Sequence, residues 1–168
     1  MKVAEYLSWF EDVVGPTERI FRSVPPEKID WKLTETSFSM GQILSHIPRA
    51  ISFMTKVLNH DELPLKSLRE IMLSNRRQPS ATVDEALADL SAATARFKAV
   101  VRGIPDEMFA VGMLDTPQLG KVQYWRYAAF VLEHHIHHLM ELHLCLKALG
   151  VKVNTGTLYS RPQAPSSP

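Results

Sequence analysis

Apolar residues recur at intervals of three and four along most of the chain, which is the spacing of an amphipathic α-helix. Four long stretches show this pattern, over about residues 3–23, 39–59, 82–103 and 120–149. No segment alternates apolar and polar residues well enough to predict a strand. The pattern therefore predicts an all-α fold, a four-helix bundle, with a short extra helix in the 60–79 connection.

Residues that favour helix starts, stops and kinks mark these stretches. Ser39 is suited to cap the second helix, and Thr82 with Glu85 forms the pattern of a capping box at the start of the third. Gly150 is suited to end the fourth helix. Gly15-Pro16 predicts a kink in the first, because proline cannot donate a backbone hydrogen bond.

Length and composition fit a single globular domain. The chain has 168 residues, of which 45% are hydrophobic and 22% charged. We assign residues 1–152 to the helical domain and residues 153–168 to a C-terminal tail. The end of that tail is rich in proline and serine, so we expect it to be flexible. Residues 105–119 are predicted to form a loop.

Charge and cysteine content exclude several classes of function. The formal net charge is +1 and no basic block occurs, so neither nucleic-acid nor membrane binding is expected. No run of uncharged apolar residues is long enough to span a bilayer. Cys145 is the one cysteine, which excludes an internal disulfide and agrees with a reducing compartment. Early acidic residues argue against a signal peptide. We therefore expect a cytoplasmic protein.

Histidines are concentrated in the last long helix, at residues 133–138. His134 and His138 are four residues apart, so their imidazoles lie on one helix face, where both could bind one metal ion. The alternative interpretation is that these histidines are solvated, or are buried and hydrogen-bonded to carbonyl groups. The other histidines of this helix point in different directions, and we expect them at flanks, at the surface or at a subunit contact: His135, His137 and His143.

His46 is the leading candidate for a third ligand, because helical spacing places it on the apolar side of the second helix. Three neutral imidazoles suit zinc or nickel better than magnesium or calcium, which prefer oxygen. Three protein ligands leave coordination positions open, which is typical of a reactive site. Glu141, one turn beyond His138, could be a further ligand, a catalytic base or an acceptor for an imidazole N–H.

Together, the segment 39–47 with His46 and the segment 133–138, followed by 146–150, resemble the DinB/YfiT-like superfamily. The resemblance covers about residues 1–152. It implies a four-helix bundle with unusual connections, often a homodimer, and a zinc or nickel site whose ligands are His46, His134 and His138.

Members of this superfamily with known activity include transferases and isomerases that use low-molecular-weight thiols such as bacillithiol or mycothiol. Many other members are classed only as metal-dependent hydrolases. The resemblance implies an activity of one of these kinds. Many members continue with Arg-Gly-Gln where this chain has Leu139-Met140-Glu141. We therefore expect a metal-dependent thiol transferase or hydrolase acting on a small molecule. The alternative is a non-catalytic, stress-related bundle with a structural or vestigial metal site.

Overall fold

A computed structural model describes residues 1–63, 68–75 and 78–159 of the chain. Within these ranges the secondary structure is mostly helical, as expected, with one small sheet. The elements in chain order are α1 Val3–Val14, α2 Thr17–Arg22, a short 3₁₀ helix Pro26–Lys28, α3 Met40–Leu58, α4 Leu68–Asn75, α5 Val83–Arg102, α6 Asp106–Val111, β1 Met113–Thr116, β2 Gly120–Gln123, α7 Tyr124–Ala148 and α8 Thr155–Tyr159.

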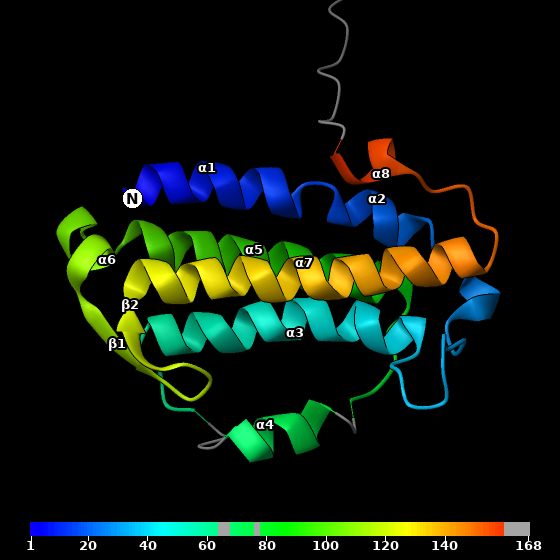
Figure 1. The fold of residues 1–168 in the computed structure, drawn as a ribbon, viewed down its shortest axis with the longest axis horizontal. Helices are drawn as coiled ribbons and strands as arrows, with labels where there is room; N and C mark the ends of the chain where they lie inside the picture. The colour runs from blue at the N-terminus through cyan, green and yellow to red at the C-terminus, as the bar shows by residue number, and fades with distance from the viewer. Residues whose placement is uncertain (64–67, 76–77, 160–168) are drawn as a thin grey trace, which may run out of the picture.

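The long helices α1, α3, α5 and α7 run side by side (Figure 1). Helix α3 packs on α5 and α7, and α1 packs on the same two helices from the other side. Aromatic residues fill the contact on the α1 side, where the rings of Phe10 and Phe97 stack with centroids 4.5 Å apart. The hydroxyl of Tyr6 donates to the carbonyl of Ala128 at 2.7 Å, which ties α1 to α7. Helix α7 is thus covered on opposite sides.

The predicted helix signals appear in the structure with one difference. Ser39 accepts a hydrogen bond from the backbone of Gln42, and Thr82 with Glu85 forms the predicted capping box. At Gly15–Pro16 the expected kink is a complete break between α1 and α2. Pro48, by contrast, lies within α3 without ending it.

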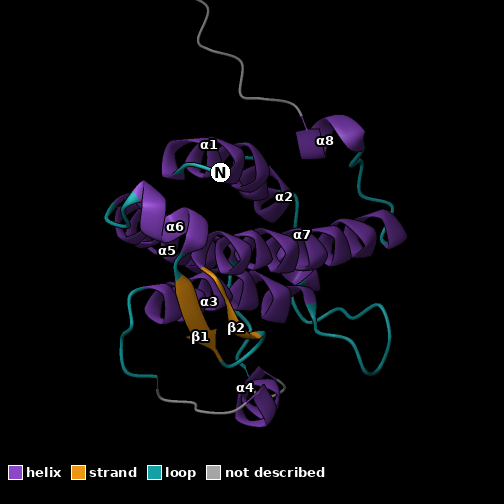
Figure 2. Cartoon of the chain, turned by 60° about the vertical axis from the view of Figure 1, so that its left-hand side comes forward, coloured by secondary structure: helices purple, strands orange, loops and turns teal. Residues whose placement is uncertain are grey.

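A β-hairpin between α6 and α7 overturns the expectation of no strands (Figure 2). Strands β1 and β2 pair antiparallel, with Leu114 opposite Val122. The turn is closed by Thr116, whose hydroxyl donates to the carbonyl of Gly120, where the backbone φ is +66°. Each strand has four residues, too few for a clear alternation. The predicted loop over 105–119 therefore contains α6 and β1, and α7 begins at Tyr124 rather than near residue 120.

Two shorter helices lie at the edges of the fold. Helix α4 confirms the short helix predicted within the 60–79 connection. Helix α8 lies in the segment assigned to the tail, and its Leu158 is buried. The domain boundary at residue 152 stays a prediction, and residues 160–168 of the tail lie outside the described part of the chain. In the described residues, no helix combines the length and the apolar character needed to cross a membrane.

Candidate metal centre

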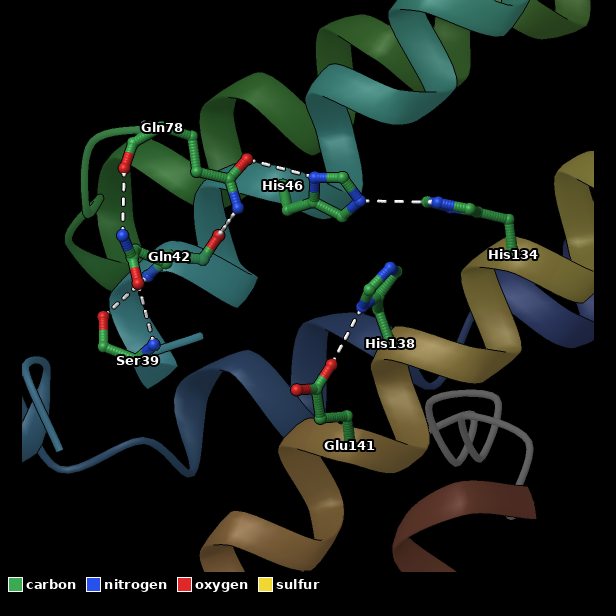
Figure 3. Close-up of polar contacts among 7 residues, drawn as sticks. All are labelled: Ser39, Gln42, His46, Gln78, His134, His138 and Glu141. Atoms are coloured by element: carbon green, nitrogen blue, oxygen red, sulfur yellow. Dashed lines mark hydrogen bonds and ion pairs between the residues drawn. The ribbon is translucent and has the colours of Figure 1, made fainter. Parts of the chain in front are cut away.

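Helices α3 and α7 bring the three predicted histidines together (Figure 3). The Nε2 atoms of His46 and His134 are 3.4 Å apart. The ring of His138 lies beside both, with centroids 4.4 Å from that of His46 and 4.7 Å from that of His134. One nitrogen from each of the three imidazoles lies within 4.8 Å of the others. The side chains thus converge on one point between the two helices.

This spacing fits a tetrahedral metal ion. Zinc–nitrogen bonds are about 2.0–2.1 Å long, so two imidazole nitrogens on a tetrahedral ion lie about 3.3–3.4 Å apart. The Nε2 atoms of His46 and His134 have this separation. His46 is 3% exposed and His138 is 9% exposed, so both side chains are largely buried. The cluster could therefore hold a divalent ion.

Hydrogen bonds to Gln78 orient His46 and select its tautomer. The Gln78 amide donates through Nε2 to the carbonyl of Gln42 at 3.0 Å, so its Oε1 is free to accept. That oxygen lies 3.0 Å from Nδ1 of His46, which must therefore carry the proton. The Nε2 lone pair of His46 then points toward His134, as a metal ligand requires.

Gln42 holds Gln78 in place through a second, reciprocal hydrogen bond. The amide of Gln42 donates to the Gln78 carbonyl at 3.2 Å, while its oxygen accepts from the backbone of Ser39. Gly41 allows the loop to approach this closely, because a Cβ there would lie 2.8 Å from that of Ser80. The start of α3 therefore fixes the residue that orients His46. Sequence reasoning missed Gln78, although Ser39 and Gln42 have the spacing of a capping box.

His138 is oriented from its own helix by Glu141. Nδ1 of His138 lies 2.9 Å from a carboxylate oxygen of Glu141, which leaves Nε2 of His138 for a metal. Of the three roles considered for Glu141, this contact corresponds to the acceptor for an imidazole N–H. A catalytic role for Glu141 stays a prediction.

Burial keeps the imidazoles of His46 and His134 neutral. Loss of hydration, together with the neighbouring His138, lowers the pKa of His46 to about 4 and that of His134 to about 3. Because these values lie far below 7, both side chains are unprotonated at neutral pH. Neutral imidazole is the form that binds metal.

The remaining histidines of α7 do not share one environment. His137 is exposed, as expected for a flank or surface position. His135 and His143 are buried, at 2% and 3% exposed, so the surface position, one of those expected for them, is wrong. Nε2 of His135 lies 2.8 Å from the hydroxyl of Thr17. Helix α2 covers this side of α7 at His135. Helical spacing predicts the direction in which a side chain points, but not which other helix covers it.

A cavity of about 850 Å³ opens beside the histidines. His46 and His134 form part of its wall, together with residues of α3, α4, α5 and α7. Phe130, one turn before His134, lies against the His134 ring with centroids 6.2 Å apart. A small organic molecule in this cavity would therefore reach the histidine nitrogens.

One protein-family model matches residues 10–142 of the chain, and its family is described as the DinB superfamily. The chain belongs to the DinB superfamily. This confirms the resemblance seen in the histidine motifs. Among curated proteins, no sequence matches this chain.

Solved DinB-like structures share the fold. A DinB-like protein from Bacillus subtilis is 18% identical, with a TM-score of 0.64, over 87% of this chain and 92% of that one. A DinB-like protein from Bacillus cereus is 12% identical, with a TM-score of 0.72, over 91% of this chain and 96% of that one. At these identities the likeness concerns the fold alone.

A second possible ligand group of this DinB-superfamily chain overlaps the first. His137, His138 and Glu141 also have ligand atoms within 4.8 Å of one another. His137 is exposed, and the group lies on a single helix. Both groups contain His138. An ion bound to His138 could therefore take its other ligands either from His46 and His134 or from His137 and Glu141.

Proposed function

We propose that this protein is a divalent-metal-dependent enzyme, with His46, His134 and His138 as ligands of zinc or nickel. In this proposal the helices α1 with α2, α3, α5 and α7 form a four-helix bundle around the site. Three protein ligands leave a coordination position for a substrate group. When bound, the ion would act as a Lewis acid on that group.

The cavity beside the histidines is the observation that carries the proposal. A structural metal site is normally closed by its protein ligands, whereas a catalytic site has access for a substrate. Here two of the three imidazoles, His46 and His134, line a cavity of about 850 Å³, within the size range of small-molecule sites. This argues for an enzyme rather than a non-catalytic bundle with a structural ion.

Transfer of a low-molecular-weight thiol fits the surrounding groups best. A thiolate is a good ligand for zinc or nickel and is the reactive form of a thiol. Glu141 does not line the cavity, and its carboxylate accepts from His138. Its role in this proposal is therefore to hold His138 in place, while His46 is held by Gln78.

Hydrolysis is the second candidate, and Asp89 is the observation that favours it. Asp89 is a carboxylate of α5 that lines the cavity, where it could serve as a base for an attacking water molecule. In a transferase this carboxylate has no such role. Substitution of Asp89 by Asn should therefore abolish a hydrolase and leave a transferase largely active.

Metal content provides the first test. Protein purified without a chelating tag should contain about one equivalent of zinc or nickel, measured by elemental analysis. The His46→Ala variant should lose the metal, whereas His137→Ala should retain it. The two variants divide the overlapping ligand groups, because both keep His138. Retention in His46→Ala with loss in His137→Ala would assign the ion to the other group and contradict the proposal.

Turnover provides the second test. The metal-loaded protein should consume a low-molecular-weight thiol in the presence of an electrophilic acceptor, and His46→Ala should not. Hydrolysis of esters and amides without thiol would favour the hydrolase. Stoichiometric metal without either reaction would support the non-catalytic alternative. The homodimer and the cytoplasmic location stay predictions, and sedimentation of the purified protein tests the first.

A further inference from the structure

The cavity extends along α3 away from the metal centre. His46, Arg49, Phe53 and Lys56 all line it, and their spacing of three, four and three residues places them on one helix face. Ten residues separate His46 from Lys56, which corresponds to about 15 Å along the helix axis. The cavity is therefore long enough for an extended molecule with one end at the histidines.

Much of the cavity wall is apolar. Ala92 and Ala93 of α5 line the cavity. Phe53 and Phe130 are half-buried, and Ile71 of α4 also lines the cavity. Such walls favour a ligand with an apolar body.

The charged groups of the lining are mostly basic. Arg49, Lys56 and Arg96 line the cavity against one carboxylate, that of Asp89. Arg96 is paired with Asp61 at 2.9 Å. Within the described residues, neither Arg49 nor Lys56 takes part in an ion pair. Two cations are thus available to a ligand, and one of them, Arg49, lies one helical turn from His46.

We propose that the substrate is an elongated organic anion with an apolar body, whose acidic groups are bound by Arg49 and Lys56. This inference rests on the proposed function, since it places the reacting end of the substrate at His46 and His134. Arg49 would bind a carboxylate, phosphate or sulfonate beside the metal centre, and Lys56 would bind one further along the cavity. A cationic molecule of the same shape would be rejected by both.

Three probes that share an eight-carbon alkyl chain and differ in charge test this substrate class: octanesulfonate, octanol and octyltrimethylammonium. Binding is measured by calorimetry on the metal-free and the metal-loaded protein. Octanesulfonate should bind at least about tenfold more tightly than octanol, because a charge-assisted hydrogen bond contributes at least that factor to the affinity. Octyltrimethylammonium should bind most weakly. A sulfonate is a poor metal ligand, so its binding reports on the cavity rather than on the ion.

Charge-removing variants locate the anion. Arg49→Gln and Lys56→Gln should each weaken octanesulfonate binding and leave octanol binding unchanged. The variant with the larger effect should weaken octanesulfonate binding by about tenfold. Arg102→Gln and Lys147→Gln are matched controls, since neither residue lines the cavity. Equal affinity for the three probes, or loss of affinity that is the same in the controls, would overturn the proposal.

The two proposals fail in different ways. Charge-selective binding by a protein that holds no metal would refute the proposed function and leave the anion site standing. Stoichiometric metal and turnover without any charge selectivity would refute the substrate class alone.

Discussion

His134 and His135 are neighbours in the chain, yet they lie in two different regions of the molecule. His134 faces α3, where its Nε2 lies 3.4 Å from that of His46. His135 faces α2, where its Nε2 lies 2.8 Å from the hydroxyl of Thr17. Burial lowers the pKa of both, to about 3 and about 4. Burial and protonation therefore do not distinguish a ligand from a packing residue.

The difference lies in what each ring nitrogen meets. At the α3 side, several imidazoles direct unprotonated nitrogens toward one point beside a cavity. At the α2 side, a single imidazole meets a hydroxyl, and its Nδ1 has no hydrogen-bond partner among the described residues. Convergence and access define the candidate metal site, and the His135 site has neither.

Alanine substitution of the two neighbours should have opposite effects. Loss of a residue that only hydrogen-bonds to a metal ligand typically lowers metal affinity about 10–100-fold. His134→Ala should lower it by more than this, because the substitution removes a proposed ligand. His135→Ala should leave metal affinity unchanged but destabilise the fold by about 2–4 kcal/mol, as other large-to-small core substitutions do. Metal titration and urea denaturation of both variants give the two readouts. A similar loss of metal affinity in both would contradict the comparison.

The metal-free protein should lose stability as the pH falls from about 6.5 toward 4. The pKa values of His46 and His135 are about 4 in the folded protein, whereas unfolded histidine has a pKa of about 6.5. Between these values the unfolded chain binds protons that the folded chain does not, so stability is fully present above about pH 6.5 and decreases as the pH falls through this range. Each histidine contributes at most about 1.4 kcal/mol per pH unit.

Urea denaturation between pH 7.5 and 4.5 measures this dependence, and a His135→Leu variant serves as the comparison. The variant should show a shallower decrease, because one buried histidine no longer takes up a proton on unfolding. An unchanged slope would mean that His135 is already protonated, or accessible to water, in the folded protein.

Gln78→Leu should lower metal affinity by about 10–100-fold without removing a ligand, because it removes the acceptor that orients His46. Gln78→Glu keeps an acceptor for Nδ1 of His46 and should restore part of the affinity. Gln123→Leu is the control, since Gln123 is exposed on β2. Metal competition titrations measure all three variants. Equal affinities would show that His46 needs no support from the loop.

Periodicity and capping signals predicted the helical part of the fold well. Ser39 and Thr82 occur where α3 and α5 begin, and α4 lies within the 60–79 connection. The hairpin was missed because strands of four residues leave almost no pattern. The hairpin forms through pairing between β1 and β2, and the pattern within either strand alone does not indicate this pairing.

For the candidate site, helical geometry predicted direction but not surroundings. It placed His134 and His138 on one face, and the structure brings His46 to that face. It could not show that α2 covers the face of α7 that carries His135. Gln78 lies 32 residues from His46 in the sequence, in a loop, so no local pattern connects the two.

The smallest effect should come from Thr17, the partner of His135. Thr17→Val keeps the shape of the side chain but removes the hydroxyl, so Nε2 of the buried imidazole loses its partner. Leaving a buried polar group unsatisfied costs about 1–3 kcal/mol, and the metal affinity should not change. The double variant Thr17→Val with His135→Leu should recover part of this loss, because it removes the unsatisfied group as well. Urea denaturation of the single and double variants measures this coupling. If Thr17→Val also weakened metal binding, the two sides of α7 would be linked through the helix, and His135 would belong to the support of the metal centre.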